Sequence, residues 1–285
     1  MIRPPVWLLA AVLALAAAPT MAQEAPQRAI THIAGDLYRF QNNFHYSVLL
    51  VTNEGILVTD PINADAARWL KGQLAERFPD TPVRYLVYSH DHADHIAGGE
   101  VFADEAIVIA HRRAKADIIG EQRPTAVPEL TFSEAMTIEL GGRTVDLRYI
   151  GQGHSDNMII MHFPAERAVF AVDFISVNRL PYRDLTDAYF PEWIGGVEMV
   201  EAMDFDILVP GHGPLGTPED VTEHRRYLQA LYDAVLAAAR EGQSLEEMKA
   251  GIQLEEFSHL GQYEAWRELN IEGMYRQIAL HRRGN

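Results

Sequence analysis

The sequence predicts an α/β fold, a four-layer αββα sandwich in which two mixed sheets pack together and helices cover the outer faces. Short apolar or alternating strand patterns occur in two separate groups, and segments with helical periodicity accompany each group. The chain has 285 residues, of which 48% are apolar. That is enough to bury a large core.

The first group contains four short strand patterns, at residues 36–41, 47–52, 55–60 and 83–89. Between the last two of these, apolar residues recur at helical spacing over 66–78, and Pro79 ends the predicted helix. The strand at 83–89 leads directly into a run of histidines.

The second group contains four more strand patterns, at residues 136–140, 144–150, 158–163 and 168–172. Leucine and valine at helical spacing over 228–236 predict a long late helix, and a final helix is expected around 266–278. No fixed repeat and no Pro-, Gly- or Ser-rich linker separates the halves. We therefore expect residues 23–285 to form a single domain with a helical C-terminal part.

The first 22 residues have the pattern of a signal peptide. Arg3 supplies a positive start, residues 6–18 form an apolar run, and Thr20-Met21-Ala22 gives the small-x-small pattern of a cleavage site. The run is shorter than the roughly 20 residues that span a bilayer. We expect export to the periplasm or secretion, without stable membrane insertion.

Charge and cysteine content restrict the possible chemistry. The chain has 24 Lys and Arg against 40 Asp and Glu, a net charge of −16 that becomes −17 once Arg3 is removed with the leader. This balance argues against a nucleic-acid partner and leaves a small-molecule substrate as the expectation. The absence of cysteine excludes disulfides, thiolate metal ligands and a Cys nucleophile. The sequence leaves the oligomeric state open.

The most informative motif is His-Asp-His-Ala-Asp-His at residues 90–95, between an apolar strand and a pair of glycines. A solvated polar loop is the alternative interpretation. Three of the twelve histidines within six positions make that alternative a poor one. On an irregular loop, His90 and His92 can reach one ion while Asp94 and His95 face a neighbouring one. Imidazole and carboxylate suit zinc, or else iron or manganese.

Three more candidate ligands each follow a predicted strand. His154 lies in a Gly-Gln-Gly-His-Ser turn, Asp173 ends the strand at 168–172, and His212 lies in a Pro-Gly-His-Gly-Pro turn. Each alone is compatible with a structural turn residue. Strand ends are, however, where open sheets gather their ligands. With the four from the histidine run they make seven donors, enough for two ions.

The order of these motifs over residues 36–214 resembles that of the metallo-β-lactamase-fold hydrolase superfamily. The resemblance implies three groups of residues around two zinc ions. The first zinc is held by His90, His92 and His154; the second is held by Asp94, His95 and His212; Asp173 bridges both. Asp60, which ends the strand at 55–60, resembles a carboxylate that orients a ligand imidazole. A plain turn aspartate is the alternative for Asp60.

Asp173 separates this chain from the β-lactamases of that superfamily, which have a non-bridging residue there. It resembles instead the glyoxalase, lactonase, phosphodiesterase and thiol-hydrolase branches. The resemblance therefore implies an exported binuclear zinc hydrolase. A hydroxide bridging the two ions, held by the catalytic Asp94, would cleave an ester, lactone, thioester or lactam. A phosphoester hydrolase and an iron-dependent sulfur dioxygenase are the alternatives.

Substrate choice is expected to come from loops near the ions. Candidate lining residues lie before the second strand and after the bridging carboxylate; they are His45, Arg179, Tyr182 and Trp193. Aromatic and arginine side chains suit a moderately apolar substrate that carries an anionic group. Alternatively, the aromatic residues pack against the late helices, since pockets and cores share such residues.

Overall fold

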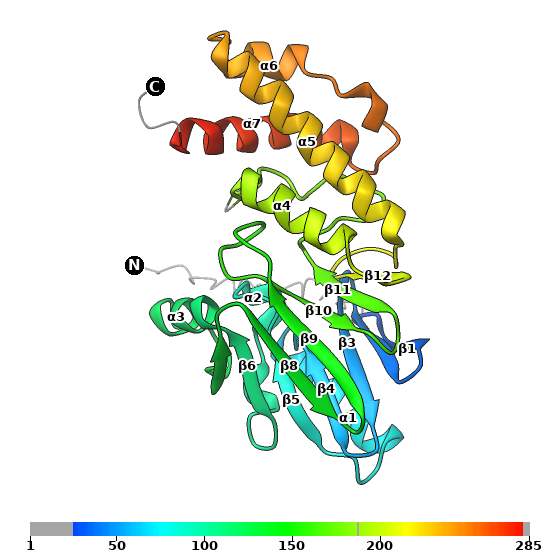
Figure 1. Cartoon of the computed structure of the whole chain (residues 1–285). Helices are drawn as coiled ribbons and strands as arrows, with labels where there is room; N and C mark the ends of the chain where they lie inside the picture. The colour runs from blue at the N-terminus through cyan, green and yellow to red at the C-terminus, as the bar shows by residue number, and fades with distance from the viewer. Residues whose placement is uncertain (1–24, 187, 282–285) are drawn as a thin grey trace, which may run out of the picture.

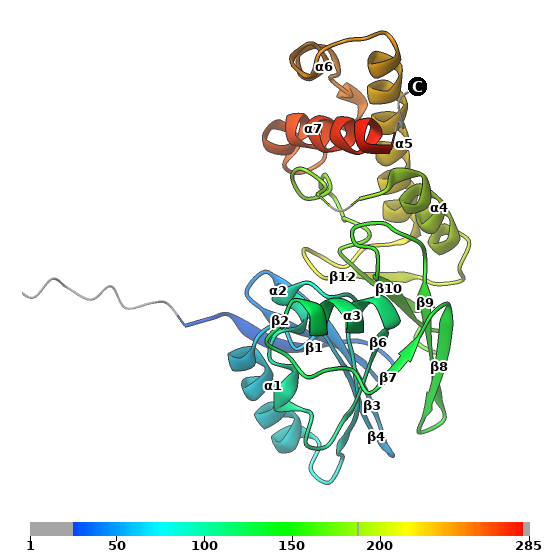
Figure 2. The same cartoon turned by 90° about the vertical axis from the view of Figure 1, so that its left-hand side faces the viewer.

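The computed structural model describes residues 25–186 and 188–281. The predicted signal peptide at 1–22 lies outside these residues. Two sheets face each other, with helices over both outer faces (Figures 1 and 2), which confirms the predicted αββα sandwich. Among the described residues, no helix is both long and apolar enough to span a membrane. The assignment of 23–285 to one domain stays a prediction.

The first sheet has seven strands that follow one another in chain order. Its first four strands are antiparallel, and the remaining pairs are parallel. The strands are β1 Arg28–Ala34, β2 Leu37–Asn42, β3 His45–Thr52, β4 Gly55–Thr59, β5 Val83–Val87, β6 Ile107–His111 and β7 Leu130–Phe132.

The second sheet has five strands in the order β12-β11-β10-β9-β8. All its pairs are antiparallel except β11 with β12. The strands are β8 Ala135–Leu140, β9 Arg143–Tyr149, β10 Ile159–Phe163, β11 Ala168–Val172 and β12 Ile207–Pro210. Both sheets are mixed, as predicted.

Helices form the two outer layers. They are α1 Ala64–Arg77, α2 Ala93–Ile96, α3 Arg112–Gly120, α4 Phe190–Glu201, α5 Pro218–Arg240, α6 Leu245–Gly251 and α7 Tyr263–His281. The side chain of Asn63 caps α1 by accepting from the amides of Asp65 and Ala66. This satisfies donors that the first helical turn leaves unpaired. Helices α5, α6 and α7 extend beyond the sheets (Figure 2).

Three apolar cores separate the four layers. The first core lies between the first sheet and its helices and includes Leu70 and Phe102. The second lies between the two sheets and includes Val87 and Phe170. The third joins the second sheet to α4–α7 and includes Leu231. Strands buried on both faces explain the long apolar runs in the sequence.

The eight predicted strands and the helices expected at 66–78 and 266–278 agree with the structure to within a few residues, whereas α5 begins ten residues before the predicted 228–236 pattern. Some elements, among them strands β1, β6 and β7, were not predicted. Helix α4 is an example, because part of it was assigned to a substrate loop. It has a proline in its first turn and two adjacent glycines, Gly195 and Gly196, which lower its intrinsic helix propensity. Burial of Phe190, Trp193 and Val197 against the core compensates for that weakness.

Candidate metal centre

All seven predicted ligands meet at one end of the sandwich, where strands of both sheets end. The histidine run follows β5, His154 follows β9, Asp173 follows β11 and His212 follows β12. Three groups of donor atoms result, and within each group all donor atoms lie within 4.8 Å of one another. The predicted convergence is therefore present in the structure.

The backbone near Asp173 is adapted to this convergence. Val172 has φ of 36°, in a region that β-branched residues rarely adopt, and the pairing of β11 with β12 shifts register beside it. Gly211 approaches the same place: a Cβ atom on it would lie 3.0 Å from Asp173 Oδ1 and 3.0 Å from His95 Cε1. Only glycine lets the His212 turn come this close. Strained backbone of this kind is concentrated at functional sites.

We call His90, His92 and His154 the inner cluster. His154 Nε2 lies 3.0 Å from His92 Nδ1, and the rings of His90 and His92 are 4.4 Å apart. His90 is fully buried, and its Nε2 has no hydrogen-bond partner. Ser89 Oγ lies 2.8 Å from His90 Nδ1, on the other side of the ring. The Nε2 atom of His90 therefore faces the cluster.

We call His45, Asp94 and His212 the outer cluster. Asp94 Oδ2 lies 3.2 Å from His45 Nε2 and 3.9 Å from His212 Nε2. His212 Nδ1 lies 2.9 Å from the carbonyl oxygen of Phe44. A donated hydrogen bond there leaves His212 Nε2 as the lone-pair nitrogen. The Asp94 side chain is 54% exposed, so this cluster opens to solvent.

His95 and Asp173 lie between the two clusters. Asp173 Oδ2 is 3.1 Å from His95 Nε2 and 3.6 Å from His154 Nε2, and its Oδ1 is 3.4 Å from His212 Nε2. Asp60 is fully buried; its Oδ2 lies 3.7 Å from His95 Nδ1, and its Oδ1 accepts from the Ser89 amide. Asp173 thus lies between the two clusters, where a bridging ligand is expected. Asp60 lies behind the His95 ring, where the resemblance places a carboxylate that orients a ligand imidazole.

Burial and neighbouring charges shift the pKa values of these groups. Burial acts to lower the pKa of His95, but Asp173 and Asp60 outweigh it and raise the value to about 9. Burial acts to raise the pKa of Asp173, but His95 and His212 hold it well below its usual range. Burial together with the neighbouring histidines lowers the pKa of His90 well below its usual value. The carboxylate of Asp173 and the imidazole of His95 thus stabilise each other's charged forms, and burial favours the neutral form of His90.

These residues fit a bound metal ion. Buried polar atoms without hydrogen-bond partners are costly. His90 Nε2 and Asp173 Oδ1 are two such atoms, and both face the centre. A cation between them would satisfy both. Imidazole and carboxylate donors suit zinc, iron or manganese.

A cavity of about 780 Å³ opens above the donors. All four predicted substrate residues contribute to its wall. Tyr182 is 57% exposed and contacts Trp266 of α7 edge-on. Trp193 is only 1% exposed, and its indole donates to the carbonyl oxygen of Phe174. Its ring also lies 5.9 Å from that of His224 in α5, so packing against the late helices describes Trp193 better than substrate contact does.

Sequence reasoning missed Asn157 and Trp266. Asn157 accepts from the Asp91 amide at 3.0 Å and donates to the Asp91 carboxylate at 2.9 Å, so it joins the His154 loop to the histidine run. Its place three residues after His154 is the one signal that could have indicated it. Trp266 reaches the cavity from α7, and no local pattern marks that approach.

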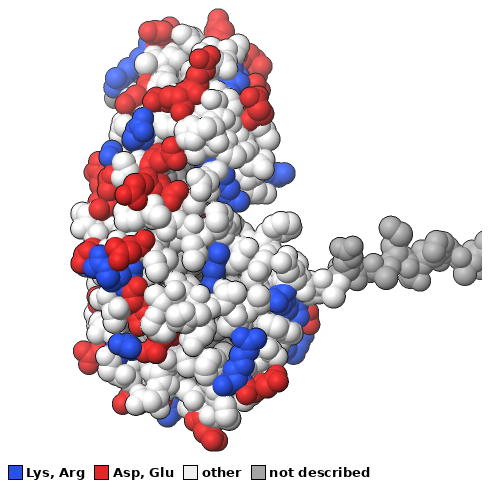
Figure 3. Space-filling model, turned by 90° about the vertical axis from the view of Figure 1, so that its right-hand side faces the viewer, with Lys and Arg blue, Asp and Glu red and all other residues white. Residues whose placement is uncertain are grey.

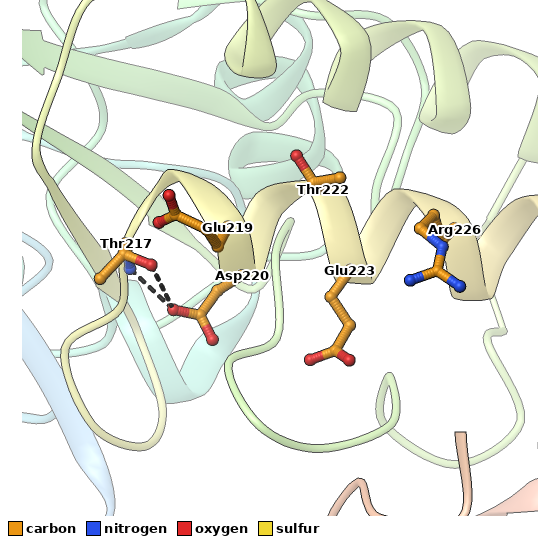
Figure 4. A pocket seen from close by; sticks show the side chains of 6 residues that line it. All are labelled: Thr217, Glu219, Asp220, Thr222, Glu223 and Arg226. Atoms are coloured by element: carbon orange, nitrogen blue, oxygen red, sulfur yellow. Dashed lines mark hydrogen bonds between the residues drawn. The ribbon is translucent and has the colours of Figure 1, made fainter. Parts of the chain in front are cut away.

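A second hollow lies at the start of α5 and contains none of the predicted site residues (Figure 4). It is lined by Thr217, Glu219, Asp220, Thr222, Glu223 and Arg226. Asp220 accepts from the amide and hydroxyl of Thr217, which is a capping box at the helix N-terminus. Asp220 in this hollow is therefore explained by helix capping.

The chain resembles several known proteins. It is 24% identical over 245 residues to 2,4-dinitroanisole O-demethylase subunit alpha of Nocardioides sp. (strain JS1661), covering 84% of this chain and 71% of that protein. It is 23% identical over 188 residues to a metallo-beta-lactamase type 2 of Bacteroides fragilis, covering 65% of this chain and 74% of that protein. The solved structure of a metallo-beta-lactamase from Pontibacter korlensis superposes with a TM-score of 0.63 at 20% identity, covering 71% of this chain and 99% of that one.

The similarity to solved structures supports the fold, and a match to a family model shows which family the chain belongs to. The model for the metallo-beta-lactamase superfamily matches residues 42–212, which is more than half of the chain. The match contains both clusters and both residues between them, and it ends at His212, before α5. The chain belongs to the metallo-beta-lactamase superfamily.

Proposed function

We propose that this protein is an exported binuclear zinc hydrolase that cleaves an ester, lactone, thioester or lactam bond. The observation that carries the proposal is the convergence of seven imidazole and carboxylate donors, five of which line one cavity. Two bound ions would supply an activated hydroxide at neutral pH and polarise the substrate carbonyl. The expectation of export depends on the signal-peptide pattern of residues 1–22 alone.

In this proposal each donor has a defined task. His90, His92 and His154 would hold the first ion, and Asp94, His95 and His212 would hold the second. Asp173 lies near donors of both groups and would be shared between the two ions. Asp60 acts from behind His95, because its buried carboxylate lies beside the Nδ1 atom of that ring.

Asp94 is the residue we propose to orient the nucleophile. Its carboxylate is the most solvent-exposed of those in the centre, and it lines the cavity. Burial acts to raise the pKa of Asp94, but the hydrogen bond from His45 and the charge of His95 lower it. The carboxylate is therefore ionised at neutral pH and can accept a hydrogen bond from an attacking water.

The position of Arg179 is evidence for a substrate that carries an anionic group. It lines the cavity, and its Nε atom has no hydrogen-bond partner. Burial lowers the pKa of Arg179, and the Asp173 carboxylate partly offsets that effect. Tyr182 and Trp266 provide apolar surface nearby. A moderately apolar ester or lactone with a carboxylate would use both features.

The charge distribution agrees with a small-molecule substrate. On the face shown in Figure 3, acidic side chains gather over the helical part, and lysine and arginine lie singly or in small groups among other residues. A nucleic-acid backbone would require a basic stripe. With a net charge of −16, the chain would repel such a partner.

The test combines metal analysis with a chromogenic substrate panel. Protein purified without added metal is analysed for zinc, iron and manganese, and is then assayed with ester, lactone, thioester, cephalosporin and phosphodiester substrates. 2,4-Dinitroanisole is included because the protein named for it aligns over 84% of this chain. We expect two zinc ions per chain and chelator-sensitive cleavage of a carbonyl substrate. One iron per chain, or turnover that chelation leaves unchanged, would contradict the proposal.

Arg179→Met tests the substrate class within the same assay. Methionine keeps an unbranched apolar stem but removes the charge. We expect KM to rise for an ester carrying a carboxylate and to stay unchanged for its neutral amide analogue. An equal effect on both substrates would show that Arg179 supports the loop rather than the substrate.

A further inference from the structure

The β2–β3 hairpin adds a histidine to the donor set that none of the ligand motifs contains. His45 begins β3, and its Nε2 lies 3.2 Å from Asp94 Oδ2. Its ring centroid is 4.6 Å from that of His212, and the donor atoms of His45, Asp94 and His212 lie within 4.8 Å of one another. Two ligands placed 2.0–2.1 Å from a tetrahedral ion lie roughly 3.3–3.4 Å apart. The spacing of His45 and Asp94 matches that of two ligands of one ion.

Three contacts fix the hairpin to the turn that carries His212. The Tyr46 amide donates to the Gly211 carbonyl at 2.8 Å, and His212 Nδ1 donates to the Phe44 carbonyl at 2.9 Å. The Arg39 guanidinium donates to the Gly213 carbonyl and lies 3.5 Å from the centre of the Tyr46 ring. His45 and His212 therefore form one structural unit.

We propose that His45 is a direct ligand of the second metal ion, beside Asp94 and His212. The inference rests on the proposed function, because it assumes that the same centre binds two ions. With His95 and Asp173 nearby, the second ion would have five protein donors within reach, against four for the first ion.

Cysteine substitution tests direct ligation. The chain contains no cysteine, so a thiolate-to-cobalt charge-transfer band in the near ultraviolet can arise only from an introduced residue. We expect His45→Cys loaded with Co²⁺ to show this band. Phe44→Cys is the matched control, because Phe44 is the neighbouring residue and is 82% exposed. That variant should lack the band. A band absent from His45→Cys, or equally strong in both variants, would overturn the inference.

Metal affinity gives a second readout. In chelator competition with Zn²⁺, His45→Ala should weaken one of the two ions by about 10–100-fold or more and leave the other unchanged. Phe44→Ala should weaken neither. If the unsubstituted chain binds two ions and His45→Ala binds both with unchanged affinity, the inference is wrong and the proposed function stands. If the unsubstituted chain binds no divalent ion, both are wrong.

Discussion

The inner and outer clusters use similar donors but are supported in different ways. Behind the inner cluster lies a buried polar network in which Asn157 bonds to Asp91, and Arg123 donates to the Asp91 carboxylate at 2.8 Å. Asp91 and Asn157 are 6% and 2% exposed. The outer cluster instead depends on a surface hairpin bonded to the His212 turn. The inner cluster is therefore ordered by the core, and the outer cluster by the packing of two loops.

The largest effect is expected where the two clusters meet. Asp173→Asn keeps the size of the side chain but removes the charge that His95, His154 and His212 all face. We expect both ions to bind more weakly and hydrolysis to fall at least about 100-fold, more than the loss of a supporting residue causes. Metal content after dialysis and initial rates measure this.

Asp146→Asn in β9 is the matched control for Asp173→Asn. Its carboxylate accepts a hydrogen bond from Thr137 on the neighbouring strand, and it is not among the donors of the centre. This variant should keep full metal content and activity. Retention of both ions by Asp173→Asn would show that the clusters do not share this carboxylate.

An intermediate effect is expected from Asn157→Ala. The substitution leaves the buried amide and carboxylate of Asp91 without this partner, which should cost about 1–3 kcal/mol of unfolding free energy. Because Asn157 joins the loops of the inner cluster, the affinity of the first ion should fall by about 10–100-fold. Chelator competition and urea unfolding measure the two effects.

Arg39→Met is the counterpart for the outer cluster. Burial lowers the pKa of Arg39 to about 10, and its guanidinium contacts the Gly213 carbonyl and the Tyr46 ring. Removing the guanidinium should loosen the hairpin and weaken mainly the second ion. If Asn157→Ala and Arg39→Met each weaken both ions equally, the two clusters are a single unit and the comparison is wrong.

The smallest effect on metal binding is expected at His224 in α5, whose ring lies 5.9 Å from that of Trp193. His224 of α5 is 3% exposed, and burial lowers its pKa to about 3. In the unfolded chain His224 binds a proton near pH 6.5, whereas in the folded chain it stays neutral until about pH 3. Its contribution to the free energy of unfolding is therefore full above pH 6.5 and declines as the pH falls toward 3. The decline approaches about 1.4 kcal/mol per pH unit.

His224→Gln should therefore flatten the fall in unfolding free energy between pH 6.5 and 5, without changing metal affinity at pH 7. Urea midpoints at several pH values measure it. His32→Gln, at an exposed position on β1, is the control and should leave the slope unchanged. An unaltered slope in His224→Gln would mean that other groups account for the acid sensitivity.

Local sequence was sufficient for most of the strands, although not for β1, β6 and β7, and for most of the candidate centre. Alternation and apolar runs have short periods, so they can be recognised within a few residues. Asp173 and His212 were identified because each follows an apolar run, where a polar residue needs a reason to be present. His154 was identified from the Gly-Gln-Gly-His-Ser turn that follows an alternating strand. The histidine run needed no more than its own six positions.

Only the tertiary structure decided which segments far apart in the chain contact one another. Arg39 and Gly213 are 174 positions apart, and Asn157 and Asp91 are 66 apart. Trp193 was ambiguous because apolar side chains suit a core and a pocket equally. His45 lies on a hairpin whose neighbours depend on the order of strands in two sheets. That order follows from global packing, which no short stretch of sequence encodes.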